Sequence, residues 1–372
     1  MLSSPEGSRP RATRRRRAPG ITFALSLCVL PRLATAEVLH PHEAPRVAFE
    51  VSTILFGSCL SADRPHPIFD AIVSDDPDLF VFTGDNVYAD TNDRQVMSRR
   101  YDTLAESPRF QILAGRAPII ATWDDHDYGK NDAGREYSMR KSSEAQFEKF
   151  WGLGPESEAA NRDGVYQSYL FGPEERRVQV ILLDTRFFRS ALKRGRSLDS
   201  LGPYAVNDSL DATILGSAQW SWFEEELTRP AKFRVVVSSI QVLPEAHGWE
   251  SWANFPFERQ RFIQSVSDRN GGVVVILSGD RHFAEISALQ LDGGARILEV
   301  TSSGLNRQFP APVPNRNEHR VGGYFLDHNY GALRIDWTGA VPSVFVSVAD
   351  REGTIVIETK IEMSDTAESV SR

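Results

Sequence analysis

The chain has 372 residues, of which 41% are hydrophobic and 25% are charged, and its formal net charge is −8. This composition is ordinary for a globular protein, and the length suits one large domain or two small ones. A chain of this size can bury a substantial core, so the fold does not need a metal ion or a disulfide merely to hold together.

The first 36 residues differ in composition from the rest. A basic patch at residues 14–17 precedes a short apolar run at residues 21–30, and residues 34–36 form the small-residue sequence Ala-Thr-Ala. This order is typical of a secretory signal peptide, although a disordered basic tail is the alternative. We therefore expect cleavage near Ala36 and export to the periplasm or the medium, by the Sec or the twin-arginine route. No apolar run is long enough for a transmembrane segment.

Removal of residues 1–36 makes the chain more acidic. The segment holds seven Arg and one Glu, so the remainder has 35 basic and 49 acidic residues and a net charge of −14. Such a surface repels polyanions, and we expect no nucleic-acid-binding module. Positive charge for an anionic substrate must then come from metal ions and a few placed side chains. We expect a monomer.

The chain has two cysteines, of which Cys28 lies in the apolar run near the N-terminus. Cys59 would then be the only thiol of the exported chain. A lone thiol in an exported protein is either buried and inert or has a specific role.

After a linker at residues 37–50, short apolar runs alternate with helical segments. The runs lie at residues 54–56, 79–82, 118–121, 178–183, 235–237 and 273–277. They are continuous rather than alternating, which predicts strands buried on both faces. Helices are expected at residues 65–74, 144–151 and 217–227. The pattern indicates an α/β fold with a central sheet covered by helices.

The C-terminal part is rich in predicted strands. They lie at residues 297–301, 333–336, 343–348 and 354–361, with turns expected at residues 303–306 and 329–331. We expect one domain over residues 51–362, followed by a flexible tail at residues 363–372.

Polar residues directly follow all six apolar runs, where the loops of an α/β sheet converge on a site. Asp85 follows the second run, and Tyr88 lies three residues later, so one turn can direct both at the same ion. A carboxylate that bridges two metal ions is what hydrolysis of a phosphate ester requires. The alternatives are that Asp85 caps a helix and that Tyr88 belongs to the core.

Two further segments are rich in metal-ligand types. Residues 123–127 read Trp-Asp-Asp-His-Asp, and three acids so close together repel one another unless cations neutralise them. Asp280 and His282 flank Arg281 after a predicted buried strand, so their side chains can point the same way. A solvated acidic loop and a core histidine are the respective alternatives.

These segments, in this order, resemble those of PhoD-type alkaline phosphatases. They are Gly-Ser-Cys at 57–59, Gly-Asp-Asn-Val-Tyr-Ala-Asp at 84–90, Trp-Asp-Asp-His-Asp at 123–127, Leu-Asp-Thr-Arg at 183–186 and Ser-Gly-Asp-Arg-His-Phe at 278–283. The resemblance covers residues 55–331. It implies a four-layer αββα sandwich of the calcineurin-like metallophosphoesterase type and a site that uses Fe(III) and Ca(II).

The resemblance also implies roles for single residues. The ligands of iron would be Cys59, Asp85, Tyr88 and His282, and those of calcium would be Asp85, Asp125 and Asp280. Thiolate and phenolate suit ferric iron, and carboxylates suit calcium. His126 would contact the phosphate and assist departure of the leaving group.

Other positions remain open at this stage. Arg186 would steady the phosphate or form a structural pair with Asp184. Asn131 and Asp132 would reach the calcium side. Gln241 would be a weak ligand or a strand cap.

The expected activity is hydrolysis of phosphate monoesters or diesters, in which water activated by the metals attacks phosphorus in line. A phospholipase D-type phosphodiesterase and a non-catalytic metal-binding relative are the alternatives.

Overall fold

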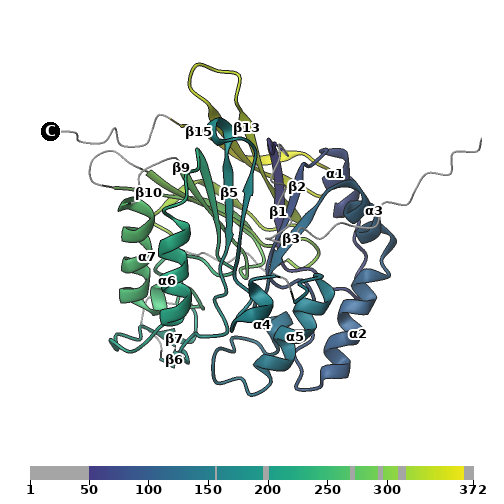
Figure 1. The fold of residues 1–372 in the computed structure, drawn as a ribbon, viewed down its shortest axis with the longest axis vertical. Coiled ribbons are helices and arrows are strands. Elements are labelled where there is room, and N and C mark those ends of the chain that lie inside the picture. Colours follow the sequence, from purple (N-terminus) through teal and green to yellow (C-terminus); the bar gives the residue numbers. More distant parts are fainter. Residues whose placement is uncertain are drawn as a thin grey trace, which may run out of the picture. The chain divides into compact units, whose positions relative to one another are not determined.

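The computed structural model describes residues 50–155, 157–195, 201–268, 273–291, 296–308 and 316–363 (Figure 1). The predicted signal peptide, residues 37–49 of the predicted linker and residues 364–372 of the predicted tail lie outside the described residues. None of the helices in the described ranges combines the length and the apolar character of a membrane span.

Within these ranges the strands form two large mixed sheets and one small one. The first large sheet has the order β15-β14-β13-β1-β2-β3, and the second has the order β12-β10-β11-β9-β8-β5-β4. The strands of the first are β1 (Thr53–Gly57), β2 (Leu79–Thr83), β3 (Ile119–Thr122), β13 (Asn329–Asp336), β14 (Ser343–Asp350) and β15 (Ile355–Glu362). The strands of the second are β4 (Gln167–Phe171), β5 (Val178–Leu182), β8 (Phe233–Val237), β9 (Val273–Ser278), β10 (Ala284–Gln290), β11 (Arg296–Ser302) and β12 (Arg320–Phe325). The small sheet pairs β6 (Lys193–Arg194) with β7 (Tyr204–Ala205).

Each large sheet contains a group of parallel strands. Strands β1, β2 and β3 are parallel, as are β5, β8, β9 and β11. In the first sheet the parallel group forms one end, and β13 pairs antiparallel with β1; in the second sheet antiparallel β4 and β10 lie on either side of the parallel group. Because the carboxyl ends of parallel strands lie at one edge of a sheet, each group presents several loops together.

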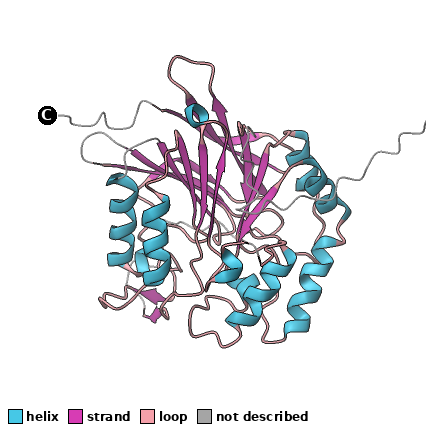
Figure 2. Ribbon diagram, in the orientation of Figure 1, coloured by secondary structure: helices cyan, strands magenta, loops and turns pink. Residues whose placement is uncertain are grey.

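The α-helices cover the outer faces of the two sheets (Figure 2). They are α1 (Ile68–Ser74), α2 (Arg94–Ala105), α3 (Pro108–Arg116), α4 (Asp125–Tyr128), α5 (Arg140–Phe150), α6 (Gly216–Glu226) and α7 (Pro256–Asp268). Short 3₁₀ helices lie at Ala159–Asn161, Glu174–Arg176 and Trp252–Asn254.

Alternate residues of the central strands pack into different layers. In β1, Ile54 and Phe56 belong to the core between the two sheets, whereas Leu55 belongs to the core beneath α1, α2, α3 and α5. In β8, Val235 faces the core between the sheets and Val236 faces the core beneath α6 and α7. Burial on both faces explains the continuous apolar runs. The architecture is therefore the four-layer αββα sandwich that the resemblance implied. The single central sheet indicated by the apolar runs is wrong, because the strands divide between two large sheets.

The predicted strands and helices are present, with shifts of a few residues at their ends. The turn expected at residues 329–331 is wrong, because these residues begin β13. Gly331 is needed there for close packing, since a Cβ atom at this position would lie 2.1 Å from Cζ of Phe56. The glycine at this position therefore indicates close contact between β13 and β1 and not a turn.

Candidate metal centre

The loops that follow β1, β2 and β9 contain residues with an unusual backbone. Positive φ angles are found at Cys59 (61°), Asp85 (51°), Asp280 (65°) and His282 (59°). Such angles are uncommon for residues other than glycine, and they cluster at functional sites where surrounding contacts maintain them. These four positions are all predicted site residues.

The loops after β2 and β3 touch one another closely. Gly84 has a φ of 108°, and a Cβ atom there would lie 2.6 Å from Cβ of Asp124. Only glycine allows this approach without strain. As a result, Asp85 is brought beside the acidic segment that follows β3.

Asp85 lies at the centre of the predicted site and is fully buried. Its Oδ2 accepts hydrogen bonds from the Tyr88 hydroxyl (3.0 Å) and the Cys59 thiol (3.4 Å). Its Oδ1 accepts the backbone N–H of His126 (3.3 Å). Burial raises the pKa of Asp85 well above its usual value. A buried carboxylate with neighbours on both oxygens is well placed to join two ligand groups.

The four residues predicted to hold iron lie together. Ligand atoms of Cys59, Asp85 and His282 all lie within 4.8 Å of one another. The Tyr88 hydroxyl is 3.0 Å from Nε2 of His282. Burial raises the pKa of the Cys59 thiol and the pKa of Tyr88. A bound cation would offset the cost of ionising these buried groups.

Asp85 also belongs to a second set of candidate ligands, which consists mainly of carboxylates. One group joins Asp85, Asp125 and His126, and another joins Asp124, Asp125 and Asp280, again within 4.8 Å. Asp124 was not among the ligands predicted from the sequence, although it lies in the acidic segment at residues 123–127. Burial raises the pKa of Asp124 well above its usual value and that of Asp280 to about 6.

Two buried oxygens in this set support a cation. Oδ1 of Asp125 and Oδ2 of Asp124 have no hydrogen-bond partner among the described residues. An unpaired buried carboxylate oxygen is costly, and oxygen donors are the ligands that hard divalent cations prefer. The donor chemistry therefore fits two metal ions, with thiol and phenol on one side and carboxylates on the other.

Asp132 extends the acidic set beyond Asp125. Its backbone N–H donates to Oδ2 of Asp125 (2.6 Å), and its carboxylate accepts from Asn131 (2.7 Å). Burial raises the pKa of Asp132 to about 7. Asp125 and Asp132 also form a candidate group with Glu250, a residue not singled out from the sequence. Glu250 is already paired with arginines, so it is less available to a metal.

His126 is held by a carboxylate that the sequence analysis assigned no role. Nδ1 of His126 lies 2.8 Å from both oxygens of Asp90, which is two residues after Tyr88. Burial lowers the pKa of His126, but Asp125, Asp85 and Asp90 outweigh this effect and raise it to about 11. The imidazole ring is also 4.1 Å from the Tyr88 ring. This arrangement favours a protonated imidazole directly beside the candidate ligands.

Arg186 has a different environment from the one expected. Its side chain is fully buried, and the guanidinium pairs with Asp124 and Glu250. The alternative, a structural ion pair, is supported, but the partner is not Asp184, whose side chain accepts the backbone N–H of Arg186 (2.8 Å) and not the guanidinium. Contact between Arg186 and a substrate phosphate is disfavoured by this burial. Its guanidinium instead fixes the acidic loop after β3.

Gln241 belongs to a hydrogen-bond network of the second sheet. Its amide nitrogen donates to Glu285 of β10 (2.8 Å) and to Thr301 of β11 (2.9 Å). The side chain is fully buried. Gln241 therefore connects strand ends through its amide nitrogen, while Oε1, the atom that would ligate a cation, is buried without a hydrogen-bond partner among the described residues.

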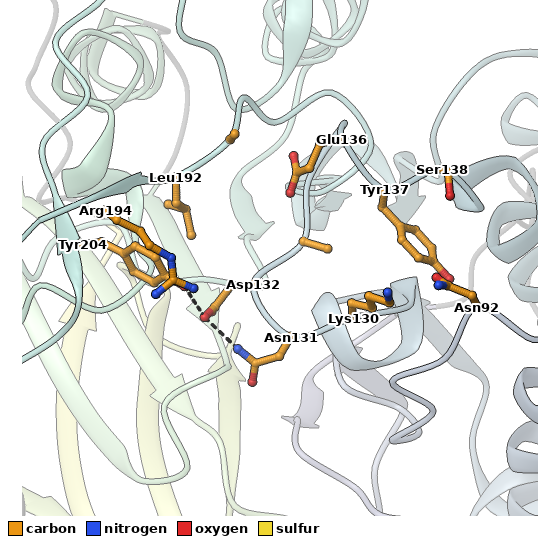
Figure 3. A pocket seen from close by; sticks show the side chains of 12 residues that line it. Asn92, Lys130, Asn131, Asp132, Glu136, Tyr137, Ser138, Leu192, Arg194 and Tyr204 are labelled. Carbon is orange, nitrogen blue, oxygen red and sulfur yellow. Dashed lines mark hydrogen bonds between the residues drawn. The ribbon is translucent and has the colours of Figure 1, made fainter.

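A pocket of about 430 Å³ opens beside Asp132 (Figure 3). Polar and charged side chains line much of it, including Lys130, Asn131, Arg194 and Tyr204. The Tyr204 hydroxyl donates to Asp132 (2.5 Å), so one wall of the pocket is tied to the acidic set. The pocket therefore offers space for a polar group next to the candidate metal centre.

A protein family and several known proteins resemble this chain. The family described as PhoD-like phosphatase matches residues 55–330. Alkaline phosphatase D of Bacillus subtilis (strain 168) is 24% identical over 206 residues, which cover 50% of this chain and 34% of that relative. The match thus spans about a third of the relative's length.

Two solved structures share the fold. The structure of PhoD aligns with a TM-score of 0.60 at 19% identity, covering 85% of this chain and 73% of that one. A dimetal phosphatase from Danio rerio aligns with a TM-score of 0.51 at 12% identity, covering 84% of this chain and 99% of that one. At these identities the likeness concerns the fold alone. Because the family match extends over most of the described chain, the chain belongs to the PhoD-like phosphatase family.

Proposed function

We propose that the chain is an exported hydrolase of phosphoric esters, an alkaline phosphatase or phosphodiesterase with an Fe(III)–Ca(II) centre. One observation carries the proposal. Asp85 belongs both to the group with Cys59 and His282 and to the group with Asp125 and His126. A shared carboxylate between two dissimilar donor sets is the arrangement that a mixed two-metal site needs.

The donor sets indicate which ion each would hold. Cys59, Asp85, Tyr88 and His282 would hold iron, because thiolate and phenolate are strong donors to a highly charged ion. Asp85, Asp125 and Asp280 would hold calcium, and Asp124 lies close enough to contribute. When bound, the two ions supply Lewis-acid stabilisation of the phosphoryl oxygens and lower the pKa of water.

His126 is proposed to contact the phosphate and to protonate the leaving-group oxygen. Asp90 orients the imidazole through Nδ1, which leaves Nε2 to face the substrate. Burial lowers the pKa of His126, whereas its hydrogen bond to Asp90 raises it and so favours a ring that carries a proton to donate.

The pocket beside Asp132 is proposed to receive the organic part of the ester. Lys130, Asn131 and Arg194 give it a polar lining. Ala133, Ala191 and Leu192 also line it, so the pocket suits an organic group that has both polar and apolar parts. Both monoesters and diesters are compatible with a pocket of this kind.

Export remains part of the proposal and rests on the sequence of residues 1–36. N-terminal sequencing of the protein recovered from the medium or periplasm tests it. A mature protein that begins close to residue 37 is expected, whereas protein retained in the cytoplasm with residues 1–36 intact contradicts export.

The activity is tested with nitrophenyl phosphate and bis-nitrophenyl phosphate on protein prepared without chelator. We expect hydrolysis of at least one substrate, and loss of activity in Asp85→Asn. Asp76→Asn is a matched control, because Asp76 is 77% exposed and pairs with Arg116 at the surface. Failure on both substrates by metal-loaded wild-type protein, or normal activity of Asp85→Asn, would contradict the proposal.

A further inference from the structure

Arg307 lies directly over the ring of Tyr88. Its guanidinium carbon is 3.8 Å from the ring centroid. The residue belongs to the loop after β11, far along the chain from the motifs that carry the predicted site. Its side chain is half-buried, so the cation is close to the candidate ligands without being enclosed in the core.

The loop that carries Arg307 is firmly attached to the Cys59 loop. The side chain of Asn306 accepts the backbone N–H of Ser61 (2.7 Å) and donates to its carbonyl oxygen (2.8 Å). The backbone N–H of Asn306 donates to the carbonyl oxygen of Cys59 (3.3 Å). The position of Arg307 is therefore set by the same loop that presents a predicted iron ligand.

Stacking on an aromatic ring uses the face of the guanidinium and leaves the N–H donors at its edge available. Within the described ranges, no carboxylate forms an ion pair with Arg307, whereas Arg186 pairs with two acids and Arg281 lies 3.7 Å from Asp280. Among the described residues, Arg307 is thus an arginine beside Tyr88 whose donors are not directed at a neighbouring acid.

Arg307 also lies near His126, the proposed proton donor. Both side chains contact the ring of Tyr88, Arg307 at 3.8 Å and His126 at 4.1 Å. The proposed proton donor and this cation therefore lie around one candidate ligand. A phosphoryl group bound at the centre carries negative charge on several oxygens, and a planar guanidinium can donate to two of them.

We propose that Arg307 binds the phosphoryl oxygens of the substrate and takes the role that the sequence analysis gave to Arg186. The inference rests on the proposed function, because it concerns the substrate of that site. It assigns to Tyr88 a second task, since the phenol ring is the platform that aligns the guanidinium with the phosphate.

The test compares Arg307→Gln and Arg307→Lys with wild-type protein. The control is Arg351→Gln, which removes the same charge from a surface arginine that pairs with Glu352 in the turn between β14 and β15. Calorimetric titration with inorganic phosphate gives the dissociation constant, nitrophenyl phosphate gives KM and kcat, and elemental analysis gives the iron and calcium content.

For Arg307→Gln we expect phosphate affinity and kcat/KM to fall about 10- to 100-fold, the range for loss of a charge-assisted hydrogen bond, with metal content unchanged. Arg307→Lys should recover part of the loss, because it retains the charge but not the planar fork. The control should match wild-type protein.

Two results would overturn the inference while leaving the proposed function intact. One is an active, metal-loaded Arg307→Gln variant with the phosphate affinity of wild-type protein. The other is a loss of affinity that only follows a loss of metal in both variants, because Arg307 would then act solely on Tyr88. Wild-type protein that neither binds phosphate nor hydrolyses the esters would overturn the proposed function as well.

Discussion

Replacement of Arg186 by Met separates a structural role from contact with the substrate. The side chain of Arg186 is 0% exposed, and those of Asp124 and Glu250 are each 1% exposed. Loss of the guanidinium leaves Asp124 buried without its cation, while Glu250 keeps Arg189 at 2.8 Å. Breaking a buried ion pair by removing one partner typically costs about 3–5 kcal/mol. Because Arg189 still neutralises Glu250 in the variant, we expect the free energy of unfolding to fall by an amount near the lower end of this range.

Urea unfolding followed by tryptophan fluorescence measures this loss, on metal-stripped and metal-loaded protein. Arg116→Met is the control, because Arg116 pairs with Asp76 at the surface, where ion pairs contribute about 0–1 kcal/mol. If Arg186→Met unfolds like the control and its main defect is a raised KM, Arg186 contacts the phosphate. The structural reasoning would then be wrong.

Three further outcomes are expected. Cys59→Ala should lower the iron content measured by elemental analysis and retain calcium, and a protein that contains only zinc would contradict the assignment of both Cys59 and Tyr88. Iron-loaded wild-type protein should show a visible tyrosinate-to-iron band that Tyr88→Phe removes; a colourless iron-loaded wild type would exclude Tyr88 as a ligand. Asp90→Asn should move the alkaline limb of the pH–rate profile to lower pH. Its carboxylate helps to raise the pKa of His126, so without it the imidazole loses its proton at lower pH. An unchanged alkaline limb would argue against His126 as the acid.

The main strands were predictable because each is a continuous apolar run followed by polar residues. Burial on both faces produces that pattern directly, as Leu55 and Phe56 illustrate by facing different cores. Helices α2, α3, α4 and α7 and strands β4, β6, β7, β10 and β12 were not predicted. Strand β12, for example, contains two glycines and is largely exposed, so its sequence carries little apolar signal.

The residues of the candidate centre were predictable for a related reason. Cys59, Asp85 and Asp280 follow the ends of apolar strands, and their donor types indicate metal ligands without knowledge of the fold. The motifs did not indicate which partner each carboxylate binds. Asp124 and Asp125 are neighbours in sequence, yet one pairs with Arg186 and the other accepts the backbone N–H of Asp132.

The sequence by itself determined the α/β class and the set of donor side chains, because both depend on local pattern and residue type. The arrangement in two large sheets was implied only by the resemblance to PhoD-type phosphatases, since the apolar runs alone indicated one central sheet. Only the tertiary structure decided which arginine is buried in the framework and which lies over Tyr88. Arg186 meets Asp124 across 62 positions of the chain, and Arg307 reaches Tyr88 from a loop anchored to Cys59. Contacts between such distant segments depend on how the two sheets pack and on the positive φ angles of the loops between them. Neither is encoded in a short motif.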